Sequence, residues 1–99
     1  MLSFYSEQFE RDMGCTAADW LRWLPAALGD HPCSMNDGAA RVQLDGGALQ
    51  LSWRVEAPLR IALVRMPRLH VEFVFTGLDD VARHRFMTRF DLYLQRGGG

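Results

Sequence analysis

The sequence predicts a two-layer α+β domain, in which a four-stranded antiparallel sheet is covered on one face by three helices. Between Arg41 and Thr76, apolar residues alternate with other residues, and this period of two is typical of strands. Segments with helical apolar spacing precede and follow this stretch. Because each predicted helix has one apolar side, the economical packing places all three on the more apolar face of the sheet. The predicted order is two helices, four strands and one helix.

Two helices are predicted before the sheet. The first covers residues 3–13, where three apolar side chains are four residues apart: Tyr5, Phe9 and Met13. The second begins at Thr16, whose hydroxyl can accept a hydrogen bond from the backbone N–H of Asp19, and it extends to Leu28. Pro25 has no N–H group to donate, so a kink or a restart of the second helix is expected there.

Residues 29–40 are predicted to form an irregular surface loop rich in turn-forming residues. The loop contains three side chains of types that ligate metals or act as nucleophiles: Asp30, His31 and Cys33. A structural zinc site needs four ligands, usually in close pairs, and neither Cys15 nor Cys33 has such a partner. We therefore predict no metal site and no cofactor, and we expect both thiols to be free.

The four predicted strands cover residues 41–45, 48–56, 59–65 and 69–76. Turn-forming residues separate them, at Asp45-Gly46-Gly47, Ala57-Pro58 and Met66-Pro67. Connections this short predict an antiparallel meander. Pairing apolar with apolar positions places Ile61 opposite Trp53 on one neighbour and opposite Phe73 on the other. On the second face, the same register places Arg54 opposite Arg60 and Ala62 opposite Glu72.

The last helix is predicted to start at Thr76 or Asp79 and to run to about Gln95. Its apolar stripe can cover the sheet and consists of Ala82, Phe86, Phe90 and Tyr93 or Leu94. Residues 1–96 are then a single domain, and the glycines at 97–99 are expected to form a flexible tail.

Composition limits the classes of function. Hydrophobic residues make up 48% of the 99 residues and the formal net charge is −1, as in globular chains. Eleven arginines balance twelve acidic residues, so we expect no binding to nucleic acid. No apolar run is long enough to cross a bilayer and no signal peptide is recognisable, so we expect a cytoplasmic protein that does not bind membranes.

The second face of the predicted sheet is mixed, and the helices leave it open. Four charged or titratable side chains are predicted to lie on it: Arg54, Arg60, His70 and Glu72. Three apolar side chains are predicted to lie among them: Ala62, Val64 and Val74. Interfaces are commonly built from an apolar centre with a polar rim. The leading hypothesis is therefore a small binding or interaction module that uses this face to form a homodimer or to bind a protein partner, including a larger complex.

The alternative hypothesis is a small enzyme or carrier with a pocket between this face and the 30–37 loop. Arg54 and Arg60 would hold a small anionic ligand, because guanidinium groups bind carboxylates and phosphates well. His70 and Glu72 would transfer a proton, since residues two apart on a strand share a face. A plainer interpretation of the same residues is a charge cluster in which Glu56 and Glu72 neutralise the arginines. No cofactor or hydrolase motif decides whether the chain is an enzyme, and a binding module is favoured.

Overall fold

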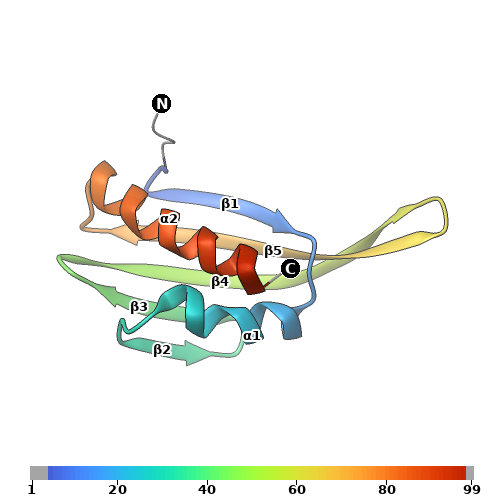
Figure 1. Ribbon diagram of the computed structural model, residues 1–99, viewed down its shortest axis with the longest axis horizontal. Helices are drawn as coiled ribbons and strands as arrows, with labels where there is room; N and C mark the ends of the chain where they lie inside the picture. Colours follow the sequence, from blue (N-terminus) through green and yellow to red (C-terminus); the bar gives the residue numbers. More distant parts are fainter. Residues whose placement is uncertain (1–4, 98–99) are drawn as a thin grey trace.

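A computed structural model describes residues 5–97, which form a five-stranded antiparallel sheet covered on one face by two helices (Figure 1). The elements in chain order are β1 (Gln8–Met13), α1 (Ala17–Leu28), β2 (Cys33–Asn36), β3 (Ala39–Leu44), β4 (Gly47–Ile61), β5 (Val64–Thr76) and α2 (Asp80–Gly97). Across the sheet, the strand order is β1-β5-β4-β3-β2. The predicted α+β class and antiparallel sheet are confirmed, whereas the predicted three helices and four strands are wrong.

The predicted helix over residues 3–13 is wrong, because the described part of this segment contains strand β1. Residues 3 and 4 lie outside the described residues. Odd-numbered side chains of β1 face the helices, and even-numbered ones face the other side of the sheet. Side chains four residues apart share a face in a strand as well as in a helix, since four is a multiple of the strand period. The spacing of Tyr5, Phe9 and Met13 therefore fits both structures.

The predicted loop over residues 29–40 contains strand β2, which pairs with β3 at the edge of the sheet. The two strands are joined by the two-residue turn Asp37-Gly38, in which Gly38 has a φ of +77°. Asp-Gly is a preferred sequence for such a turn, because glycine adopts positive φ without steric cost. All four residues of β2 are exposed, and the alternation of Cys33 and Met35 with Ser34 and Asn36 is too short to distinguish a strand from a loop.

The four predicted strands are wrong in their boundaries, because Ala57-Pro58 and Met66-Pro67 do not form turns. Strands β4 and β5 continue through both prolines and form one long hairpin that turns at Ala62-Leu63. The two residues Ala57 and Pro58 lie opposite the single residue Pro67, which makes a β-bulge. Proline is tolerated at a bulge, and at free strand edges, because no ladder hydrogen bond is required from it there.

Merging the strands changes the predicted register. Trp53 lies opposite Val71 and not opposite Ile61, which pairs with Val64 near the hairpin turn. Arg54 lies opposite His70 and not opposite Arg60, whose partner is Arg65. Likewise, Ser52 and not Ala62 lies opposite Glu72. Each predicted pair assumed a turn at a proline where the chain in fact remains extended.

Helix α1 connects the two edges of the sheet. Strand β1 lies at one edge beside β5 and strand β2 at the other. The chain after β1 passes across the sheet, and α1 then runs roughly along the strands near β2 and β3 (Figure 1). Its predicted N-terminal cap is confirmed: Thr16 Oγ1 accepts from the Asp19 N–H at 3.0 Å, and an Asp19 carboxylate oxygen accepts from the Thr16 N–H at 3.3 Å. The helix continues through Pro25 to Leu28 without the restart that we expected as one alternative.

Helix α2 begins close to the predicted position. The Asp79 side chain accepts from the backbone N–H of Ala82 at 2.9 Å and caps the helix. Gly97, which we expected in a flexible tail, is the last helical residue, and Gly98 and Gly99 lie outside the described residues. Neither of the two helices in the described part of the chain is both long and apolar enough to span a membrane.

The core lies between the two helices and the sheet. Its largest fully buried side chains are Trp20 and Leu24 from α1, Met87 and Phe90 from α2, Val42 from β3, and Leu49, Leu51, Leu69, Val71, Phe73 and Phe75 from β4 and β5. Phe73 and Phe90 are in edge-to-face contact, with ring centroids 5.6 Å apart. Because these residues alternate with polar ones along β4 and β5, the core occupies one face of the sheet only.

Charged side chains tie α2 to the first strand. Arg11 of β1 donates to both carboxylate oxygens of Asp91, at 2.6 and 3.0 Å, and the Tyr5 hydroxyl donates to the same carboxylate at 3.2 Å. Arg83, which is 7% exposed, donates to the backbone oxygens of Tyr5 and Leu78. These contacts hold the N-terminal strand against the last helix.

We expect Asp91→Ala to lower the free energy of unfolding by about 1–2 kcal/mol, because Arg11 loses a half-buried carboxylate to which it donates in a bidentate manner. Urea unfolding followed by circular dichroism measures this change. Asp30→Ala is the matched control, since it removes an exposed carboxylate. Equal free energies of unfolding for the two variants would contradict the role of the Arg11–Asp91 pair.

Candidate functional site

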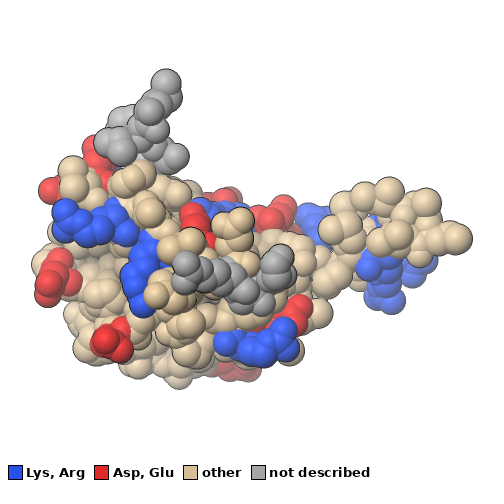
Figure 2. Space-filling view, in the orientation of Figure 1, with Lys and Arg blue, Asp and Glu red and all other residues tan. Residues whose placement is uncertain are grey.

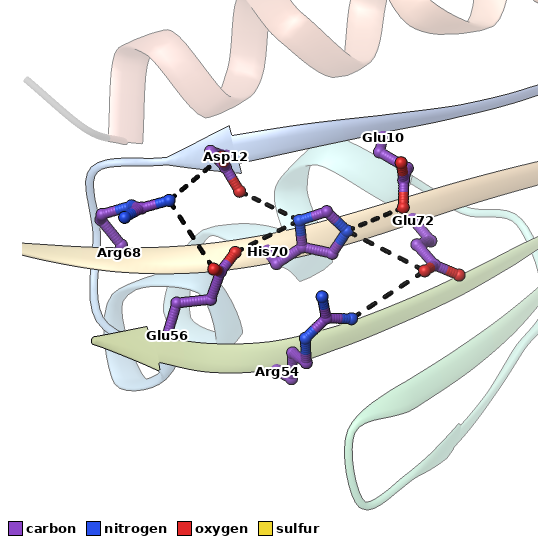
Figure 3. A network of polar contacts seen from close by, with 7 residues as sticks. All are labelled: Glu10, Asp12, Arg54, Glu56, Arg68, His70 and Glu72. Atoms are coloured by element: carbon purple, nitrogen blue, oxygen red, sulfur yellow. Dashed lines mark hydrogen bonds and ion pairs between the residues drawn. The ribbon is translucent and has the colours of Figure 1, made fainter. Parts of the chain in front are cut away.

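Seven charged or titratable side chains gather on the face of the sheet that the helices leave uncovered. We call this set the His70 network, and it comprises Glu10, Asp12, Arg54, Glu56, Arg68, His70 and Glu72 (Figure 3). They come from three neighbouring strands: β1, β5 and β4. Directly opposed residues share a face of the sheet, and the register opposes His70 to both Asp12 and Arg54, which brings the three strands together at this imidazole.

The His70 imidazole is the centre of the network. Its Nδ1 atom lies 3.0 Å from Asp12 Oδ1 and 3.3 Å from Glu56 Oε1. Its Nε2 atom lies 3.0 Å from Glu10 Oε1 and 3.9 Å from Glu72 Oε1. The side chain is 13% exposed, because the surrounding carboxylates cover it. Carboxylates therefore face both ring nitrogens.

This arrangement favours the charged imidazolium. A neutral imidazole carries one proton, so one of its nitrogens would direct a lone pair at a carboxylate. Hydrogen bonds to Asp12 and then Glu10 raise the pKa of His70, while burial and the charge of Arg54 oppose the rise. In return, the hydrogen bond from His70 is the main reason that the pKa of Asp12 is lowered.

The two arginines neutralise the network unequally. Arg68 lies 3.3 Å from Asp12 and 3.6 Å from Glu56, so both carboxylates near Nδ1 have a close cation. Arg54 lies 4.0 Å from Glu72, at the limit of an ion pair. Four carboxylates face two guanidinium groups and one imidazole, so the network is negative whether or not His70 is protonated. The negative charge is least compensated on the Nε2 side.

The structure brings together three of the four residues predicted for this face. Arg54, His70 and Glu72 belong to the network, and with Ser52 and Trp53 they border a hollow of about 190 Å³. Arg60 does not belong to it, because it lies six positions along β4 from Arg54, or about 20 Å of extended chain. Of the predicted apolar strip, Val74 lies beside the network, whereas Ala62 and Val64 lie at the far end of the hairpin. Among the residues that the structure describes, the open face therefore has no apolar centre.

The loop candidates lie apart from this network. The His31 ring packs against Phe86 of α2, with centroids 6.0 Å apart, so the loop approaches the helices and not the open face. Asp30 is exposed, and Cys33 begins strand β2 opposite Val42. The thiols of Cys15 and Cys33 are free, and burial raises the pKa of both. Met35, Asn36 and Asp37 of the predicted loop border a hollow together with Arg54, but His70 and Glu72 do not line it.

Sequence reasoning missed four members of the network: Glu10, Asp12, Glu56 and Arg68. Glu10 and Asp12 were missed as site residues because their segment was predicted to be helical. Glu56 was predicted to neutralise arginines, but not to contact His70. One signal could have found the first pair, since Gln8, Glu10 and Asp12 alternate with Phe9 and Met13, as strand residues do, although Arg11 interrupts the apolar set.

The raised pKa of His70 predicts a pH dependence of stability. Because the pKa of His70 is higher in the folded state than its unfolded-state value of about 6.5, protonated His70 stabilises the fold at pH values below about 6.5. This contribution is lost as the pH rises through the folded-state pKa. We expect the free energy of unfolding to fall from about pH 6 to about pH 9 in the wild type more than in His70→Gln. Urea unfolding with a chelator present measures the difference.

A double variant, Glu10→Gln with Asp12→Asn, keeps the imidazole and removes the two charges that raise its pKa. It should show the weak pH dependence of His70→Gln. If the free energy of unfolding of this variant falls with pH as steeply as that of the wild type, Glu10 and Asp12 are not the cause of the raised pKa of His70.

Comparisons with known proteins give no relative for this chain. No protein-family model matches it, no curated protein matches it, and no solved structure matches it. Function must therefore be inferred from the residues and geometry of the chain itself.

Proposed function

We propose that this chain is a self-associating interaction module, in which a second copy covers an apolar arm that projects from the sheet. The arm is the end of the β4–β5 hairpin, residues 57–68. It extends beyond both helices and beyond the other strands (Figure 1). Its projection is the observation that carries the proposal, because nothing else in the described part of the chain covers its tip.

The arm has one apolar side and one basic side. Leu59 pairs with Met66 and Ile61 with Val64, so these four side chains share one side of the ribbon. All four are more than 40% exposed, and Leu63 at the turn is fully exposed. Arg60 and Arg65 pair on the opposite side. Figure 2 shows the arginines, in blue, along one side of the projecting arm and uncharged side chains at its end.

An isolated arm of this composition is poorly stable in water. A two-stranded ribbon is marginally stable unless a third strand or another surface packs on it. Large aliphatic side chains gathered on an exposed surface are typical of sites that bind another protein. We therefore expect the apolar side of the arm to be covered in the assembled protein, with the two arginines left in water.

A second copy is favoured because the chain also carries a matching apolar hollow. The hollow has a volume of about 340 Å³ and lies near the base of the arm, between α1, the β2–β3 turn and β4. Three exposed apolar side chains contribute to it: Leu21, Met35 and Val55. If the arm of each copy enters the hollow of the other, a two-fold dimer buries both features at once.

This proposal keeps self-association but changes the surface expected from the sequence. Two of the three residues of the expected apolar strip, Ala62 and Val64, lie in the arm. The enzyme or carrier hypothesis is less favoured, because Arg54 and Arg60 are too far apart to hold one small anion. A cytoplasmic location and a different protein partner also remain proposals.

We expect the wild type to have twice the monomer mass of 11.3 kDa in size-exclusion chromatography with light scattering, and to dissociate on dilution. Leu63→Asp in the arm and Leu21→Asp in the hollow should each weaken the dimer at least about 10-fold, because a charge replaces a buried aliphatic contact. Leu92→Asp on α2, at a leucine as exposed as Leu21, should leave the dimer intact. A wild type that is monomeric at every concentration contradicts the proposal.

Mixing the two weakened variants tests how the arm docks. The Leu21→Asp copy keeps an intact arm and the Leu63→Asp copy keeps an intact hollow, so the mixture should form a heterodimer held by one arm. If the two arms instead pack on each other, every mixed pair contains one damaged arm, and Leu21→Asp alone should dimerise as the wild type does. A mixture that contains no heterodimer therefore contradicts docking into the hollow.

A further inference from the structure

We infer that Glu10, His70 and Glu72 bind a divalent transition-metal ion such as Zn²⁺, and that Asp12 orients the imidazole for this purpose. The site lies on the open face and not in the arm. Its three ligands do not line the hollow that receives the arm, although Arg54 borders both. The inference does not depend on self-association. No metal site was predicted from the sequence, because the candidate ligands were sought in the loop and not across neighbouring strands.

The three ligand atoms are already close together. Glu10 Oε1, His70 Nε2 and Glu72 Oε1 lie within 4.8 Å of one another, with the two carboxylate oxygens 3.0 and 3.9 Å from the nitrogen. Ligands that surround one Zn²⁺ at about 2.0–2.2 Å are separated from each other by about 3–3.5 Å. Small rotations of the glutamate side chains are therefore sufficient to bring all three atoms to an ion.

The backbone supports this geometry. Glu10 of β1 lies directly opposite Glu72 of β5, and His70 is the next residue on the same side of β5. All three ligands thus come from two paired strands, where the ladder fixes the distances between their Cα atoms. A site on paired strands is more rigid than one on a loop, which favours metal binding.

Asp12 supplies the second requirement of a histidine ligand. Asp12 Oδ1 lies 3.0 Å from Nδ1 and can accept its proton, which leaves the lone pair of Nε2 for the metal. Metal-binding histidines commonly direct their other nitrogen to a carboxylate, which fixes the tautomer and makes the imidazole a better ligand. Arg68 in turn holds Asp12 at 3.3 Å.

The charges around His70 favour a cation on the Nε2 side of the ring over the Nδ1 side. Asp12, Glu56 and His70 Nδ1 are also close enough to share an ion. Arg68, however, contacts both carboxylates of that group, whereas the nearest guanidinium on the Nε2 side is 4.0 Å from Glu72. A cation is therefore repelled less at Nε2. Hollows of about 190 and 260 Å³ border Glu72 on either side, with room for water or a further ligand on the ion.

The chemistry of the ligands indicates the class of ion. Imidazole nitrogen binds Zn²⁺ and other first-row transition ions well, whereas Mg²⁺ prefers oxygen ligands and retains its waters. Three protein ligands leave at least one coordination position open. Protons compete with the ion for Nε2, so binding should weaken as the pH falls and His70 becomes protonated.

Isothermal titration calorimetry with ZnCl₂ near neutral pH tests the site, in a Cys33→Ser background that removes the exposed thiol. We expect one Zn²⁺ per chain and no heat with MgCl₂. Glu10→Gln and Glu72→Gln should each raise the Kd at least about 10-fold, and Asp12→Asn should raise it by a similar factor. His70→Gln should remove detectable binding.

Glu56→Gln is the control that distinguishes the two sides of the imidazole. Like Glu10→Gln it removes one carboxylate charge, but it does so beside Nδ1. The Kd of this variant for Zn²⁺ should remain well below that of Glu10→Gln. ¹⁵N NMR of the wild type should show Zn²⁺ shifting Nε2 and not Nδ1, which needs no variant to fold. Absent Zn²⁺ binding, undiminished binding in His70→Gln, or a greater loss in Glu56→Gln than in Glu10→Gln would each overturn the inference.

Discussion

The pairing of β1 with β5 is the contact on which the rest of this structure depends. It encloses β5 between two strands and stacks Phe9 on Phe73, with ring centroids 4.6 Å apart. Because β1 lies at one edge of the sheet and β2 at the other, the intervening chain, which contains α1, must cross the apolar face. The same pairing places Arg11 against Asp91 of α2 and places Glu10 and Asp12 against His70. One strand thus stabilises the core and completes the polar network.

The two faces of the sheet differ because their polar groups are balanced differently. On the helical face, Arg11 and Asp91 form a matched pair, and the buried Arg83 is satisfied by two backbone oxygens and Asp80. On the open face, acidic groups outnumber basic ones around one imidazole, so a positive charge at that position is stabilising. A proton supplies that charge on His70, and a metal ion on Nε2 would supply it in another form. The network is therefore suited to binding a cation, in contrast to the anion site expected from the arginines.

The arm forms because the two prolines interrupt the pairing of β4 with β5 without ending the hairpin. Pro58 is accommodated in the bulge and Pro67 lies opposite it, where the ladder needs no donor from either. Beyond the bulge, no strand or helix within residues 5–97 covers the apolar side chains of the ribbon. Prolines and arginines at free strand edges also discourage unlimited strand addition. An arm that docks into a defined hollow is compatible with this protection, since docking needs side-chain contacts and not edge pairing.

The sequence by itself determined the features that depend on local chemistry. These include the Thr16 cap, the turn after Leu44, the start of α2 and the apolar faces of β4, β5 and α2. It also placed Arg54, His70 and Glu72 on one open face, because alternation along a strand is a local property.

Tertiary structure alone decided where β1 pairs, that β2 forms at an exposed edge, and that the prolines bend a ribbon where turns were expected. Each of these features depends on which segments pack beside it. Apolar residues four positions apart fit both a helix and a strand, and an X-Pro pair fits both a turn and an extended strand. Asp12 and Glu10 of β1 are 58 and 60 residues away from His70 in sequence, and Glu56 is 14 residues away. Only the register of three strands brings these partners to one imidazole.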